Sequence, residues 1–122
     1  MIAQVAFAQV RSCLIVTLLG ELDVRGIGEL RDALLARIAA QRTRGVILDV
    51  STVTVLDADD VVALTHTLTM CRVLGARALV VGLSPAVVHA LVLLDAPLDG
   101  LDAGASVESA LALLNCGGVN AA

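Results

Sequence analysis

The stretch GVILDVSTVTVLDADD, residues 45–60, decides the fold. Its first part, VIL at 46–48, is an apolar and β-branched run that predicts a fully buried strand. A short loop follows, and Asp57 then stands where a helix would begin, with Asp59 and Asp60 in its first turn. Because the first N–H groups of a helix are unpaired and carry partial positive charge, carboxylates at that position stabilise it. The stretch therefore predicts a strand, a loop and a helix with an acidic tip.

Apolar strand patterns alternate with helical patterns along the rest of the chain. Strands are predicted at residues 2–10, 13–19, 46–50 and 78–81, with a short one near 98–101. Helices are predicted at residues 27–40, 57–74, 84–94 and 106–114. This alternation predicts an α/β fold, with one mixed, mostly parallel sheet of four to five strands and about four helices. The first strands are expected to pair antiparallel at one edge.

Several positions are typical of the boundaries between these elements. Gly75 is a helix-ending residue after the helix at 57–74. In the pair Ser84-Pro85, serine can cap a helix and proline favours its first position. Asp49 ends the strand at 46–50 and is expected to accept hydrogen bonds from N–H groups of the following loop.

Composition bounds the size and the class of the protein. The chain has 122 residues and is expected to form a single domain over 1–122, with a core at about 10–114 and a frayed tail at 117–122. Because 58% of the residues are hydrophobic and 16% are charged, some apolar surface is expected to meet another protein, which favours an oligomer. No signal peptide and no apolar run long enough for membrane insertion is seen.

The same counts exclude several kinds of function. A net charge of −4 and a single aromatic residue argue against nucleic-acid binding and against stacking of a cofactor. The three cysteines are odd in number and widely spaced, which predicts neither a disulfide framework nor a zinc site and favours the reducing cytoplasm. No metal motif, nucleophile signature or phosphate-binding loop is present, so we expect no catalytic residues, no metal and no cofactor.

A phosphate-accepting receiver domain is an alternative that the sequence disfavours. Glu21 and Asp23 would be its acidic residues and Asp49 its acceptor. The chain has no lysine to neutralise an acyl phosphate, and the two acids lack the adjacency that a magnesium site prefers.

The deciding stretch, extended to GVILDVSTVTVLDADDVVAL at 45–64, resembles the core signature of STAS domains, the bacterial anti-sigma-factor antagonists. LGAR at 74–77 and VGLSP at 81–85, which includes Gly82, resemble a second family segment, and residues 20–35 fit the family's first helix. The resemblance covers about residues 10–114. It is closest to stressosome STAS proteins of the RsbS and RsbR kind.

The resemblance implies a non-enzymatic phosphoswitch module. In the family, a GHKL-type serine kinase, which also acts as an anti-sigma factor, phosphorylates the hydroxyl after the helix-capping aspartate and so changes the bound partner. In this chain Ala58 replaces that hydroxyl, and Ala90 stands at the counterpart of a second threonine in the third helix. The resemblance places partner binding at Asp57, Ala58, Asp59 and Asp60, with sister STAS proteins as partners.

Three explanations for Ala58 stay open. It can lock the domain in its unmodified form, or Asp59 or Asp60 can imitate the phosphorylated form, or the chain is a scaffold that assembles with switchable paralogues. Nearby hydroxyls in the loop, Ser51, Thr52 and Thr54, are weaker candidates for modification. A STAS subunit that regulates an ABC-type lipid or anion transporter is the alternative function.

Overall fold

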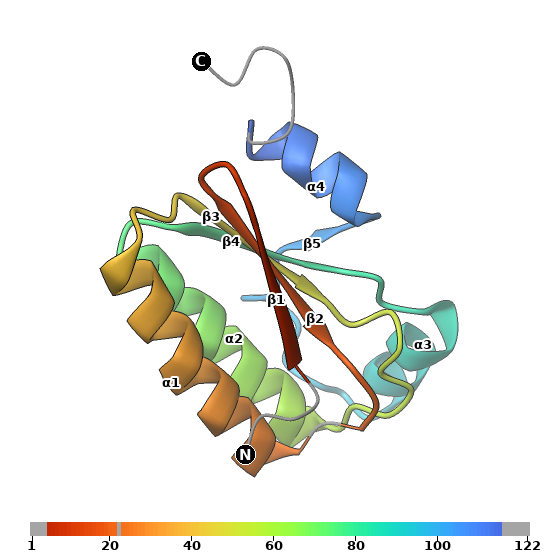
Figure 1. Cartoon of the computed structure of the whole chain (residues 1–122). Helices are drawn as coiled ribbons and strands as arrows, with labels where there is room; N and C mark the ends of the chain where they lie inside the picture. Colours follow the sequence, from red (N-terminus) through yellow and green to blue (C-terminus); the bar gives the residue numbers. More distant parts are fainter. Residues whose placement is uncertain (1–4, 22, 116–122) are drawn as a thin grey trace.

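Five strands lie in sequence order across one sheet, β1-β2-β3-β4-β5 (Figure 1). The computed structural model describes residues 5–21 and 23–115. The first strand pairs antiparallel with the second, and all other neighbours are parallel. The predicted mixed, mostly parallel sheet with an antiparallel edge is therefore confirmed. Its strands are β1 Val5–Val10, β2 Cys13–Leu18, β3 Gly45–Asp49, β4 Arg77–Val81 and β5 Ala103–Gly104.

Four helices surround the sheet, as the sequence predicted. They are α1 Val24–Ala40, α2 Ala58–Val73, α3 Pro85–Leu93 and α4 Val107–Leu113. The first two lie side by side, and α4 lies on the opposite face of the sheet (Figure 1). The third helix follows the carboxyl end of β4, beside the loop that leads into α2.

The core forms two clusters because the central strands are buried on both faces. The larger one fills the space between the sheet and the first two helices and includes Leu48, Leu34 and Leu64. The smaller one, Ile47, Leu79, Val81 and Ala110, lies under α4. A strand buried on both sides needs a continuous apolar run rather than an alternating one, which is what residues 46–48 provide.

Within the described residues, two elements differ from the prediction by more than one residue. The first helix starts at Val24, not at residue 27, because the side chain of Asp23 accepts a hydrogen bond from Gly26 N at 2.7 Å and so caps it earlier. The short last strand is at Ala103–Gly104, not near 98–101. Leu98 and Leu101 are instead partly buried against the large cluster. The predicted tail at 117–122 lies outside the described residues.

The cysteines differ from the prediction in one respect. Cys13 is disulfide-bonded, which the odd number and wide spacing of the cysteines did not predict. Cys71 is a free thiol inside the large cluster, and burial raises its pKa to about 11. None of the described helices is long and apolar enough to cross a membrane.

Candidate functional site

The start of α2 is held by a reciprocal pair of hydrogen bonds. Asp57, the N-cap, accepts from Asp60 N at 2.8 Å, and the carboxylate of Asp60 accepts from Asp57 N at 3.1 Å. This capping box satisfies two backbone donors that would otherwise be unpaired. The cap that the sequence predicted at Asp57 is thus present, and it fixes the direction in which residues 57–60 face.

The four residues of this tip differ in exposure. Asp57 and Asp59 are exposed, and Ala58 between them is half-buried. Asp60 is only 6% exposed, because its carboxylate turns inward to complete the cap. Burial raises the pKa of Asp60, and repulsion from the carboxylates of Asp57 and Asp23 acts in the same direction. Of the four residues that the resemblance assigns to partner binding, Asp60 is therefore the one that orders the tip from inside.

The loop that leads into α2 is tied to the strands on both sides. Asp49 accepts a hydrogen bond from Ser51 N at 2.9 Å, the role the sequence predicted for it. The hydroxyl of Thr52 donates to the Leu18 carbonyl at 2.8 Å. Gly82 has a φ of +83°, and a Cβ there would lie 2.9 Å from Ser51. Because Gly82 has no side chain, the backbone just after β4 can lie directly against the loop at Ser51 and hold that loop in place.

The third helix carries Ala90, the counterpart of the family's second threonine, at the surface. Ser84 caps this helix by accepting from Val87 N at 3.1 Å, and Pro85 takes the first helical position, both as predicted. Ala90 is exposed, as are Val88 and Val92 on the same helix. The surface at α3 is therefore apolar.

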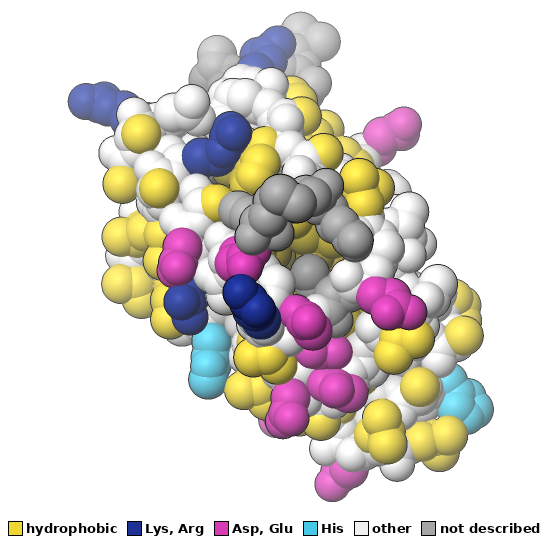
Figure 2. All heavy atoms as spheres, turned by 60° about the horizontal axis from the view of Figure 1, so that its bottom comes forward, with side chains coloured by type: hydrophobic (Ala, Val, Ile, Leu, Met, Phe, Trp, Pro, Cys, Tyr) yellow, Lys and Arg dark blue, Asp and Glu magenta, His cyan; other side chains and the backbone are white. Residues whose placement is uncertain are grey.

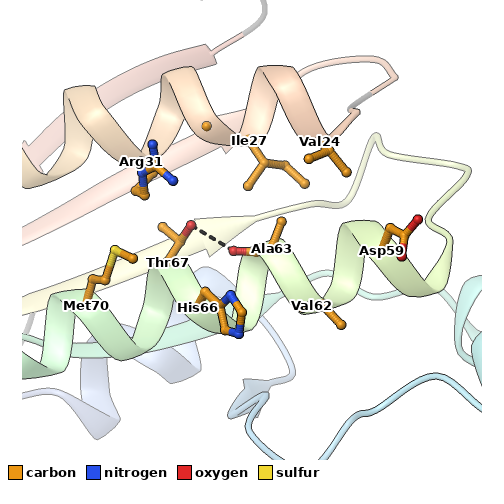
Figure 3. A pocket seen from close by; sticks show the side chains of 10 residues that line it. Val24, Ile27, Arg31, Asp59, Val62, Ala63, His66, Thr67 and Met70 are labelled. Carbon is orange, nitrogen blue, oxygen red and sulfur yellow. Dashed lines mark hydrogen bonds between the residues drawn. The ribbon is translucent and has the colours of Figure 1, made fainter.

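A groove of about 430 Å³ runs between the first two helices and was not predicted (Figure 3). Val24, Ile27 and Arg31 line it from α1, and Asp59 and His66 from α2. It therefore begins at the acidic tip of α2. Apolar periodicity shows which helix faces turn inward, but the width of a gap depends on how far apart the helices pack, which the sequence does not encode locally.

The tip of α2 lies at an acidic end of the molecule. Figure 2 shows acidic side chains gathered at the end of the molecule that comes forward in this view. Within residues 5–21 and 23–115, no group of three or more His, Cys, Asp or Glu side chains could hold a metal ion. The tip offers carboxylates and a methyl group to a partner.

Solved structures share this fold. An RsbS variant from Moorella thermoacetica has a TM-score of 0.73 at 21% identity, over 92% of this chain and 95% of the other. The anti-sigma factor antagonist SpoIIAA in its unphosphorylated form has a TM-score of 0.63 at 16% identity, over 86% and 91%. The murine anion transporter Slc26a9 has a TM-score of 0.66 at 18% identity, over 88% of this chain and 18% of the transporter.

Sequence comparison adds the family. No curated protein matches this chain. The family model described as STAS domain matches residues 4–100, which contain every strand up to β4 and the capped start of α2. The chain therefore belongs to the STAS domain family.

Proposed function

We propose that this protein is a non-enzymatic interaction module of the anti-sigma-factor antagonist type, acting as a scaffold or partner-switching component in bacterial stress signalling. Its partners would be sister STAS subunits and a GHKL-type serine kinase in the cytoplasm. The acidic tip of α2, with Asp57, Ala58 and Asp59 at the surface, would contact them. Ala58 would keep this surface in one unmodified state.

The observation that carries the proposal is the half-buried Ala58, which stands between two exposed acids on a tip ordered by the capping box. The capping box fixes the backbone there, and the two flanking acids face solvent. Phosphorylation works by adding negative charge to such a surface, and alanine cannot accept a phosphate. Of the loop hydroxyls, that of Thr52 is engaged with the Leu18 carbonyl, which disfavours it as a substitute acceptor.

The proposal is tested by restoring the hydroxyl. Purified wild type and Ala58→Ser are incubated with the candidate kinase and labelled ATP, and the modified residue is mapped by mass spectrometry. We expect label on the serine variant and none on wild type, because the variant has the acceptor in the preordered position. Ala39→Ser, at an exposed alanine on α1 that has no proposed role, is the matched control for a new hydroxyl elsewhere. Strong labelling of wild type would refute the non-switchable assignment.

A transporter-associated role is the second candidate, and the similarity to a domain of Slc26a9 favours it. The two candidates predict different partners for the same fold. Purification of the untagged complex, followed by native mass measurement and identification of its subunits, separates them. Sister STAS proteins and a kinase support the signalling role, whereas a permease and its ATPase support the transporter role.

A further inference from the structure

The amino ends of the parallel strands carry a group of arginines. Backbone hydrogen bonds place three neighbouring segments together there: Arg44 N donates to Ser12 O at 2.7 Å, and Arg77 N donates to Arg44 O at 2.8 Å. Arg11 lies in the turn before β2, and Arg42 in the loop before β3. We call the exposed side chains Arg11, Arg42, Arg44 and Arg77 the arginine end.

The opposite end of the molecule is acidic. The loops after the carboxyl ends of β2 and β3 lead into the first two helices. The exposed acids of these loops and of the first turn of α2 form what we call the acidic end: Glu21, Asp23, Asp57 and Asp59. The two helix starts lie near one another, because Val24 of α1 and Asp59 of α2 line the same groove. Figure 2 views this end. The protein is therefore polarised along its strands.

Within the described part of the chain, the charges of these two ends take part in no ion pair. Among residues 5–21 and 23–115, the ion pairs join Arg25 to Glu29, Arg31 to Asp32 and Arg72 to Asp102. None of these residues belongs to the arginine end or the acidic end. Both ends are consequently available to charges from another molecule.

Exposed apolar side chains accompany the charges at each end. At the arginine end, Val73 is the last residue of α2 and Leu74 is its C-cap. Leu113 is the last residue of α4, and its carbonyl accepts from Arg77 at 3.5 Å. At the acidic end, the exposed apolar side chains include Leu19, Val24 and Val55. Apolar contact supplies affinity, while complementary charges select the orientation and speed the encounter.

We infer that the arginine end is a docking surface for the acidic end of a second copy of this chain. The occupant follows from charge complementarity, because the chain itself carries the matching surface at its other end. A nucleic acid is a poorer match, since the whole chain has a net charge of −4 and would repel it. The contact is head-to-tail, so it extends into a ring or a filament rather than stopping at a symmetric dimer. This deepens, and rests on, the proposed scaffold role.

Two charge-reversed variants test the contact by sedimentation velocity over a range of protein concentrations. One reverses the arginine end (Arg42→Glu with Arg44→Glu), and the other reverses the acidic end (Glu21→Arg with Asp59→Arg). The residues of the capping box are left intact. We expect wild type to associate at low salt and to dissociate at about 0.5 M salt, where charges are screened within a few ångströms. Each variant alone should associate at least about tenfold more weakly, because attraction becomes repulsion.

Mixing the two variants is the decisive measurement. Each one supplies the end that complements the other, so the equimolar mixture should regain wild-type association. Asp32→Arg, on the exposed flank of α1, is the control and should associate as wild type does. A wild type that stays monomeric at every concentration, or a mixture that stays monomeric, would overturn the inference. Neither of these two results contradicts the proposed function if the Ala58→Ser variant is phosphorylated and wild type is not.

Discussion

A single side chain, Asp57, both ends the loop and orders the tip that is proposed to meet a partner. Its carboxylate accepts from Asp60 N at 2.8 Å. Replacing Asp57 by alanine should lower the free energy of unfolding by about 1 kcal/mol, since an N-cap acceptor is lost. Urea denaturation measures this. Asp59 is exposed in the first turn of α2, two residues after the cap, so Asp59→Ala should change the free energy of unfolding by less than about 0.5 kcal/mol. Equal effects would show that the cap does not fix the tip.

The buried carboxylate of Asp60 makes stability depend on pH. Burial raises the pKa of Asp60 in the folded protein above its ordinary value of 3.8, so the folded state binds this proton more readily than the unfolded state. The contribution of Asp60 to stability is therefore present below pH 3.8 and is lost as pH rises through the folded-state pKa. Asp60→Asn removes this titration. The measured quantity is the unfolding free energy of the variant minus that of wild type. We expect this difference to be more positive at neutral pH than near about pH 4. The opposite trend would contradict the assignment.

At the scale of elements, two glycines with positive φ end segments for different reasons. Gly75 ends α2 with a φ of +94° in open space. Ala76 N donates to Cys71 O at 3.0 Å and Gly75 N to Arg72 O at 2.9 Å, which is a Schellman motif. Gly75→Ala should cost about 1 kcal/mol, from backbone conformation alone.

Gly82 adds crowding to the same backbone requirement. A methyl group there would lie 2.9 Å from both the Cβ and the N of Ser51. We expect Gly82→Ala to cost at least about 1 kcal/mol more than Gly75→Ala, because the loop before α2 must move. Urea denaturation of both variants measures the difference. Equal costs would mean that the loop at Ser51 yields freely.

The sequence predicted the helices, the strands and their caps better than it predicted whether a side chain points inward or to solvent. Asp57, Ser84 and Gly75 were identifiable because capping depends on neighbours within a few residues. The inward turn of Asp60 was missed, since a first-turn acid can point to solvent or back to the cap with the same sequence. The position of β5 was missed because a strand of two residues takes its place from its pairing with β4 rather than from a pattern.

At the scale of the whole molecule, the apolar surplus predicted from composition is found in specific places. Exposed large hydrophobic residues lie at the ends of helices and in the connecting loops, including Val55, Val73 and Leu93. Composition alone could not place them, because burial of each residue depends on which face of the sheet a helix covers. The groove between the first two helices and the polarity of charge along the strands likewise arise only when distant segments come together.

The two faces of the sheet differ in how firmly they are covered, and this predicts unequal local stability. The first two helices bury a large cluster, whereas α4 has seven residues and buries only Ala110 fully among its described residues. A helix this short is not stable alone in water, so α4 depends on its contacts with Ile47, Leu79 and Val81. Segments held by few contacts open without global unfolding.

Hydrogen exchange followed by mass spectrometry tests this difference. We expect backbone amides of α4 to exchange at least about tenfold faster than those in the middle of α2, since opening α4 exposes only the small cluster. The third helix is the matched comparison: it has nine residues and two buried side chains, Val87 and Leu91, so its amides should exchange at an intermediate rate. If α4 is protected as long as α2, the two clusters open as one cooperative unit, and the smaller one must be held by more than the contacts that these four side chains provide.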